Sequence, residues 1–141
     1  ALQAYQNSGI NAQINMLVNS GINIKLVDFI NDMPNAYAWA DVVICRAGAL
    51  TVAEIAAAVV ASIFIPFPHA VDDHQTKNAQ FLVKSGAALI LDERELTVDK
   101  LRDMLKDLAA NQGKLLTMAK AARKLAKPEA LDKVVDCCLQ K

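Results

Sequence analysis

The sequence predicts an α/β fold built on a parallel sheet from two local patterns, and its composition is consistent with this class. Short apolar runs suited to buried strands alternate along the chain with segments of helical periodicity, which is typical of parallel strands joined by right-handed crossovers. The 141 residues are 54% apolar, which is enough to build the core of one domain. The β-branched run Val42–Ile44 leads into Gly48 and a helix start, as strands of open α/β sheets do. We therefore predict a Rossmann-like parallel sheet with helices on both faces.

The individual elements follow in order from local patterns. Five strands are predicted from short apolar runs, near residues 2–5, 24–29, 42–46, 62–66 and 88–92. Four helices are predicted between them, near residues 10–20, 33–40, 51–59 and 73–86. Asp32 followed by Pro34 has the pattern of an N-cap with proline in the first turn. Ala79, Leu82 and Val83 give the fourth helix an inward-facing stripe.

After Thr97 the predicted alternation of strands and helices ends. Apolar residues there repeat at helical spacing, Gly113 is predicted to interrupt the helical pattern, and Pro128 is predicted to open a last helix. We therefore treat residues 1–141 as one domain with C-terminal helices over about residues 97–141. The chain starts without Met and inside a predicted strand, so we expect an N-terminally truncated piece of a longer protein.

Composition and missing motifs argue against several function classes. Fifteen basic residues balance fifteen acidic ones, so the chain lacks the basic footprint of a nucleic-acid-binding protein. The five glycines are too widely spaced for a dinucleotide fingerprint or a Walker loop, and no serine-hydrolase elbow or zinc-protease motif is present. The three cysteines lack metal spacing, which favours a reducing cytoplasm and predicts no metal site. No apolar stretch reaches the ~20 residues that span a bilayer.

The segment from Ile44 to Glu54 carries the strongest local signal for a ligand. The strand runs into Gly48, and Thr51 and Glu54 then have the T-x-x-E spacing of a capping box. The helix would begin with free N–H groups and the positive end of its dipole at the carboxyl edge of a strand, where open α/β sheets bind phosphorylated ligands. The same pattern also occurs where a helix merely starts, so by itself it leaves both interpretations open.

Four segments occur in an order that carries a family resemblance, namely Phe29–Met33, Ala36–Asp41, Arg46–Glu54 and Pro66–Ala79. Together they closely resemble the nucleotide-sugar half of the bacterial family 28 glycosyltransferases that make lipid II, over nearly the whole chain. The resemblance implies one half of a GT-B glycosyltransferase. It also implies binding of UDP-N-acetylglucosamine and transfer of N-acetylglucosamine to lipid I in peptidoglycan synthesis, by a peripheral protein at the cytoplasmic face of the inner membrane.

The resemblance further implies which residues hold the nucleotide. The family's Ala-Leu-Thr amides, here Ala49, Leu50 and Thr51, lie at the diphosphate, and the backbone of Ile30 meets uracil. The family's glutamate, here Glu54, accepts hydrogen bonds from the ribose, and a carboxylate one turn into the helix can accept from two adjacent hydroxyls. The alternative is that Glu54 only closes the capping box.

The sugar-binding residues implied by the resemblance lie further along the chain. Gln75 corresponds to the residue that hydrogen-bonds the N-acetylglucosamine hydroxyls, and Asn78 is assigned to the same sugar. Together with His74 they share one face of a predicted helix, and each amide offers both a donor and an acceptor. The alternative is a solvated surface. Arg46 either contributes positive charge beneath the phosphates or belongs to a buried structural pair.

Two departures from the family bear on what the chain is expected to do. Val59 stands where the family has Gly, and unless the local turn differs, positive φ at a β-branched residue would be strained by about 1–2 kcal/mol. The acceptor domain with its base and the first glycine-rich loop have no counterpart. We therefore assign the lipid I acceptor and any membrane contact to a missing N-terminal domain, and we expect this chain alone to be inactive.

Neither a cofactor nor a metal is expected, and two other functions remain as alternatives. The first is a non-catalytic donor-domain subunit that works with a separate acceptor protein. The second is a relative of the UDP-sugar epimerases, which need acid and base side chains around the sugar. Gln75 and Asn78 cannot provide these groups.

Overall fold

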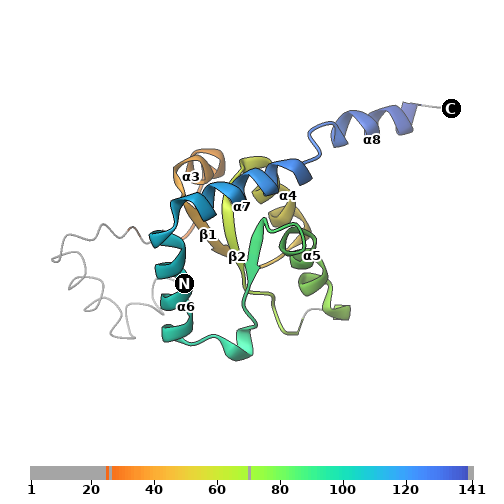
Figure 1. The fold of residues 1–141 in the computed structure, drawn as a ribbon. Coiled ribbons are helices and arrows are strands. Elements are labelled where there is room, and N and C mark those ends of the chain that lie inside the picture. The colour runs from red at the N-terminus through yellow and green to blue at the C-terminus, as the bar shows by residue number, and fades with distance from the viewer. Residues whose placement is uncertain (1–24, 26, 70, 140–141) are drawn as a thin grey trace. The chain divides into compact units, whose positions relative to one another are not determined.

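The computed structural model describes residues 25, 27–69 and 71–139 (Figure 1), and the chain divides into two units, residues 1–33 and 34–141, which are described separately. The predicted strand near 2–5 and helix near 10–20 lie outside the described residues.

The predicted strand near 24–29 is wrong for the residues that the structure describes. Residues 25 and 27–29 form no strand, and the Phe29 side chain is 75% exposed. An apolar run predicts a strand only where a neighbouring strand completes its hydrogen-bond ladder, and the sequence pattern carries no information about that neighbour.

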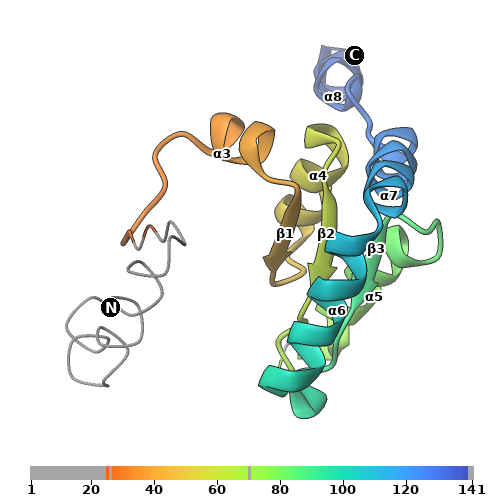
Figure 2. The same ribbon diagram turned by 60° about the vertical axis from the view of Figure 1, so that its left-hand side comes forward.

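The second unit contains a three-stranded parallel sheet with the order β1-β2-β3 (Figures 1 and 2). Its strands are β1 (Val42–Cys45), β2 (Ala61–Phe64) and β3 (Ala88–Ile90). The register aligns Val42 with Ala61 and Ser62 with Ala88, so the carboxyl ends of all three strands meet at one edge. These strands confirm the predictions near 42–46, 62–66 and 88–92 to within two residues at each end.

The helices of the described chain largely follow the predicted pattern. They are α3 (Met33–Trp39), α4 (Ala49–Ala58), α5 (His74–Val83), α6 (Val98–Ala110), α7 (Gln112–Leu125) and α8 (Ala130–Leu139), with short 3₁₀ turns η1 (Val71–Asp73) and η2 (Glu93–Glu95). The last helix begins two residues after Pro128, as predicted. The predicted break at Gly113 is wrong, because the helices separate at Asn111, whose side chain caps α7 by accepting from the Lys114 N–H.

Helices cover both faces of the sheet, which confirms the predicted fold class. The adjacent residues Ile63 and Phe64 of β2 lie in different apolar clusters, because successive side chains of a strand point to opposite faces. The cluster around Phe64 contains Ile55 of α4 and Leu82 of α5, and the cluster around Ile63 contains Leu108 of α6. Figure 2 shows α6 in front of the sheet, with α4 and α5 behind it.

Val59, directly after α4, adopts the left-handed conformation expected for this position. Its φ of 60° and ψ of 44° lie in a region that L residues with a branched Cβ rarely occupy. The local turn therefore does take a positive φ at Val59, and the valine is held in a strained conformation.

The C-terminal helix α8 presents all of its residues from Ala130 to Leu139 to solvent. Within the described part of the chain, no helix is both long and apolar enough to cross a bilayer.

Candidate functional site

The start of α4 lies at the carboxyl edge of the sheet. The chain leaves β1 at Cys45, passes the buried Ala47, and enters α4 with Gly48 as N-cap residue at φ −63° and ψ 150°. The first helical hydrogen bond runs from the Val52 N–H to the Gly48 carbonyl at 3.0 Å. The N–H groups that precede Val52 have no partner within the helix, so they and the positive end of the helix dipole can hold an anion.

The predicted capping box between Thr51 and Glu54 is wrong, because α4 starts two residues earlier than predicted. Thr51 is the third residue of the helix and not its N-cap, and Gly48 at the N-cap has no side chain with which to cap. Glu54 therefore does not close a capping box, and its carboxylate is engaged elsewhere. This outcome removes the capping box as an alternative to a binding role for Glu54.

The absence of a side chain at Gly48 leaves space beside the first amides of α4. A Cβ atom built on Gly48 would lie 3.6 Å from Thr51 Oγ1, an ordinary van der Waals contact. Its φ and ψ are accessible to every residue type. Neither packing nor backbone conformation therefore requires glycine here, whereas close approach of a ligand to the amides of Ala49, Leu50 and Thr51 would require it.

Two amide side chains from α5 reach the same edge of the sheet. Asn78 Nδ2 donates to the carbonyl of Ala47 at 3.1 Å, in the turn between β1 and α4. Gln75 Oε1 accepts from the Phe67 N–H at 2.9 Å, in the chain that leaves β2. Both side chains are half-buried. These contacts bring the predicted sugar-binding residues next to the segments that follow β1 and β2.

Backbone partners fix which atom each amide offers to a ligand. The Ala47 carbonyl can only accept, so the Asn78 atom facing it is the nitrogen, and Asn78 Oδ1 is the atom left for a ligand. The Phe67 N–H can only donate, so it faces the Gln75 oxygen and leaves the Gln75 NH₂ group. Gln75 is thus suited to donate to a sugar hydroxyl, and Asn78 is suited to accept from one.

Glu54 is held by a tyrosine that the sequence analysis did not single out. The Tyr37 hydroxyl, on α3, donates to Glu54 Oε2 at 2.9 Å. Burial, followed by the hydrogen bond and the negative charge of Glu54, raises the pKa of Tyr37 to about 12. The only sequence signal was that a tyrosine on a helix packed against a core usually has a partner for its hydroxyl. That signal does not say which residue the partner is.

Arg46 forms a structural pair, which is one of its two predicted roles. Its Nη1 atom pairs with Glu93 and donates to the carbonyls of Ile65 and Pro66, at 3.1 Å each. Its guanidinium also lies 5.6 Å from the centre of the Phe67 ring. The pair is not buried as predicted, because the Arg46 side chain is 48% exposed. Arg46 thus joins the carboxyl ends of β1 and β2, and Glu93 balances its charge.

Two further residues of the sequence analysis are Ile30 and His74. Ile30 lies in the first unit, and its predicted contact with uracil stays a prediction. His74 is the exposed first residue of α5, next to Gln75.

A groove of about 590 Å³ borders the start of α4. Four of the predicted binding residues line it, namely Ala49, Leu50, Glu54 and Asn78. Arg123 and Lys127, from the end of α7 and the turn after it, add positive charge to its wall. Phosphate groups bound at the start of α4 would therefore lie beside a groove with cationic side chains.

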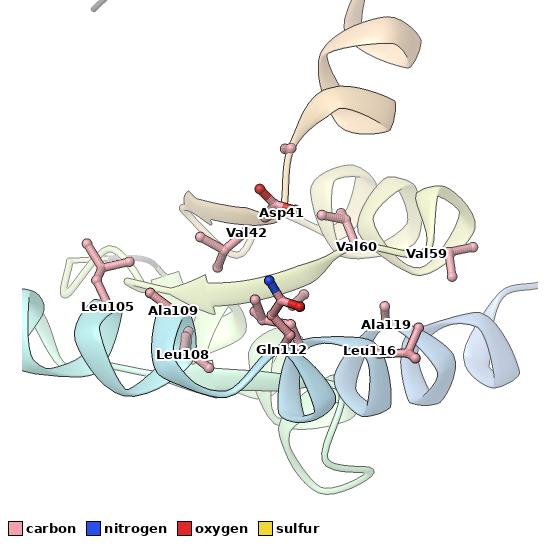
Figure 3. A pocket seen from close by; sticks show the side chains of 13 residues that line it. Asp41, Val42, Val59, Val60, Leu105, Leu108, Ala109, Gln112, Leu116 and Ala119 are labelled. Atoms are coloured by element: carbon pink, nitrogen blue, oxygen red, sulfur yellow. The ribbon is translucent and has the colours of Figure 1, made fainter. Parts of the chain in front are cut away.

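A larger groove of about 810 Å³ lies at the opposite edge of the sheet (Figure 3). The first residues of β1 and β2, Val42 and Ala61, line it together with residues of α6 and α7. Its polar side chains are those of Asp41 and Gln112, and the rest of its lining is apolar. This groove contains none of the predicted binding residues and is poorly suited to a diphosphate.

Among residues 25, 27–69 and 71–139, no three His, Cys, Asp or Glu side chains are grouped as a metal ion would require. The functional groups at the start of α4 are therefore backbone amides, a carboxylate and two carboxamides.

Known proteins resemble this chain over most of its length. The family model described as "Glycosyltransferase family 28 C-terminal domain" matches residues 2–134. A curated relative from Marinobacter nauticus, the "UDP-N-acetylglucosamine--N-acetylmuramyl-(pentapeptide) pyrophosphoryl-undecaprenol N-acetylglucosamine transferase", is 55% identical over 121 residues, which cover 86% of this chain and 33% of the relative. The protein of the same name from Coxiella burnetii is 56% identical over 117 residues, covering 83% and 33%. The chain thus spans about a third of the length of these relatives.

Two solved structures also match this chain. The crystal structure of Acinetobacter baumannii MurG matches with a TM-score of 0.84 and 42% identity, over 96% of this chain and 39% of that one. The glycosyltransferase VinC, solved in complex with dTDP, matches with a TM-score of 0.63 over 84% of this chain and 30% of its own. At 21% identity, the likeness to VinC concerns the fold alone.

Proposed function

The chain belongs to glycosyltransferase family 28, whose C-terminal domain it matches, and from this premise we propose that it is the donor-binding domain of an N-acetylglucosaminyltransferase. The proposed donor is UDP-N-acetylglucosamine. The observation that carries the proposal is the meeting of three kinds of group at one edge of the sheet. These are the free amides at the start of α4, the carboxylate of Glu54, and the carboxamides of Gln75 and Asn78.

Each part of the donor has a chemically matched group in this proposal. The diphosphate is held by the amides of Ala49, Leu50 and Thr51, where the helix dipole favours negative charge. The ribose hydroxyls donate to Glu54. The sugar hydroxyls bind Gln75 and Asn78. The uracil contact of the Ile30 backbone is proposed from the family resemblance alone.

The proposed reaction is an inverting transfer to lipid I that yields lipid II. A hydroxyl of the acceptor attacks the anomeric carbon of the donor, the bond from that carbon to the UDP oxygen breaks, and a base takes the hydroxyl proton. The amides at the start of α4 stabilise the negative charge that develops on the leaving diphosphate. The base and the lipid-linked acceptor would lie on a second domain, which would also make the contact with the membrane.

Two substitutions test how the site is divided between sugar and nucleotide. Gln75→Ala should weaken binding of UDP-N-acetylglucosamine by about 1–2 kcal/mol and leave UDP binding nearly unchanged, because only the sugar contact is lost. Glu54→Ala should weaken binding of both ligands, since both contain the ribose. Isothermal titration calorimetry on the 141-residue chain measures both effects. The same pattern from the two variants, or no binding by the unmodified chain, would contradict the proposal.

A further inference from the structure

We propose that Tyr37 is a positioning residue for nucleotide recognition, holding the Glu54 carboxylate in the orientation that accepts the ribose hydroxyls. This inference rests on the proposed function, since it assumes that Glu54 binds the ribose. Its structural basis is the hydrogen bond of 2.9 Å from the Tyr37 hydroxyl to Glu54 Oε2, which connects α3 to the second turn of α4.

The two residues differ in how firmly the fold holds them. Tyr37 packs against the apolar cluster that contains Ile55 and Phe64, so its ring has a fixed support. Glu54 is exposed and lines the groove beside the start of α4. An exposed glutamate samples many rotamers, and fixing one of them upon ligand binding costs entropy. A hydrogen bond from a supported hydroxyl removes part of that cost before the ligand arrives.

The carboxylate keeps enough capacity for a ligand while Tyr37 is bound. An ionised carboxylate has about four lone-pair positions, and the Tyr37 hydroxyl occupies one of them on Oε2. Two ribose hydroxyls can therefore donate to Glu54 without displacing Tyr37. At neutral pH Tyr37 keeps its proton for this bond, since its pKa is raised to about 12, chiefly by burial.

Two other roles for Tyr37 predict different results. If the ribose had to displace Tyr37 from Glu54, removing the tyrosine hydroxyl would strengthen nucleotide binding. If Tyr37 only supported the packing of α3, its removal would weaken every ligand to the same extent. The positioning role alone predicts a loss that depends on the ribose hydroxyls.

The experiment compares UDP with 2′,3′-dideoxy-UDP, which lacks both ribose hydroxyls, by calorimetry on the 141-residue chain. Tyr37→Phe keeps the ring and removes the hydroxyl, so it should weaken UDP about 3- to 10-fold and change 2′,3′-dideoxy-UDP less than about 2-fold. In the Glu54→Ala background, which lacks the acceptor oxygens, Tyr37→Phe should cause little further loss, because the two residues act through one contact. Trp39→Phe is the matched control, since Trp39 is on α3 and is 88% exposed.

The outcomes separate this inference from the proposed function. Equal losses for both ligands, or tighter UDP binding by Tyr37→Phe, would overturn the positioning role while leaving UDP recognition in place. A Glu54→Ala variant that binds UDP like the unmodified chain would overturn the ribose contact and the positioning role together. Failure of the unmodified chain to bind UDP would overturn the proposed function itself.

Discussion

At the residue scale, Val59 has a backbone conformation that valine disfavours, and its neighbours keep it there. It occupies the left-handed region and is followed directly by the buried Val60 and by β2, so the chain has little freedom to relax. We predict that Val59→Gly stabilises the chain by about 1 kcal/mol, because glycine adopts this conformation without the Cβ clash. Urea denaturation measures the change.

Ala58→Gly is the matched control for Val59→Gly, because Ala58 ends α4 in a helical conformation. It should destabilise the chain by up to about 1 kcal/mol, as glycine does within a helix. Loss of stability in both variants would mean that the left-handed valine is not strained.

Tyr37 gives a second residue-scale prediction, concerning pH. Its pKa is raised from 10.0 to about 12, so folding favours the protonated phenol. The resulting stabilisation is complete below the unfolded pKa of 10.0 and is lost as the pH rises towards about 12. Carbon NMR of the tyrosine ring, assigned with Tyr37→Phe, should show the midpoint near 12.

Glu54→Gln should lower the pKa of Tyr37 only in part. Burial is the largest cause of the shift, followed by the hydrogen bond that the Tyr37 hydroxyl donates to Glu54, the charge of Glu54, and the charge of Cys45. The variant removes the charge of Glu54 and leaves burial in place. A Tyr37 midpoint near 10.0 in the unmodified chain, or no change in Glu54→Gln, would contradict this account.

At the scale of elements, the start of α4 combines a weak cap with an open set of amides. Gly48 already has the extended conformation of an N-cap, and a Cβ there meets only an ordinary contact. We predict that Gly48→Ser stabilises the fold by a few tenths of a kcal/mol, because serine caps the N–H groups of the first turn. The same hydroxyl should weaken UDP binding, since it occupies amides that the diphosphate needs.

Thermal unfolding and calorimetry together test Gly48→Ser. If the introduced hydroxyl caps the helix, the variant should have a higher Tm. If the same amides bind the diphosphate, the variant should have a lower affinity for UDP. A variant that binds UDP as well as the unmodified chain would show that the start of α4 does not hold the diphosphate.

Local sequence patterns predicted most helices and strands but not the contacts between them. The strand near 42–46 could be predicted because a short β-branched run followed by a glycine turn is typical of a buried parallel strand. The start of α4 was misplaced because T-x-x-E resembles a cap, whereas the glycine that caps the helix leaves no such pattern.

The pairs Tyr37–Glu54 and Arg46–Glu93 could not be predicted from local patterns. Their members are 17 and 47 positions apart, and only the packing of α3, α4 and η2 around the sheet brings them together. The functional assignment of Gln75 came from the family resemblance, because an amide side chain on a helix has no sequence pattern that marks it as a sugar ligand. The fixed orientation of that amide became visible only with its Phe67 contact.

At the scale of the whole molecule, the proposed site would supply one side of a two-sided reaction. The chain spans about a third of the length of its curated relatives. Transfer requires donor and acceptor to be held within reacting distance, and the groups that we propose for this chain all bind the donor. We predict that residues 1–141 release no UDP above background from UDP-N-acetylglucosamine in the presence of lipid I. Lipid-dependent turnover by this chain would contradict the assignment of the base to another domain.

The central claim is that the nucleotide binds at the carboxyl edge of the sheet, at the start of α4, and not in the larger apolar groove at the opposite edge. The most direct measurement is an NMR titration of the isotope-labelled chain with millimolar UDP, in the presence of a metal chelator. We expect backbone shifts at Gly48, Leu50 and Thr51, with Leu105 and Gln112 of the larger groove unchanged. Shifts centred on Leu105 and Gln112, or no shifts without added Mg²⁺, would contradict it.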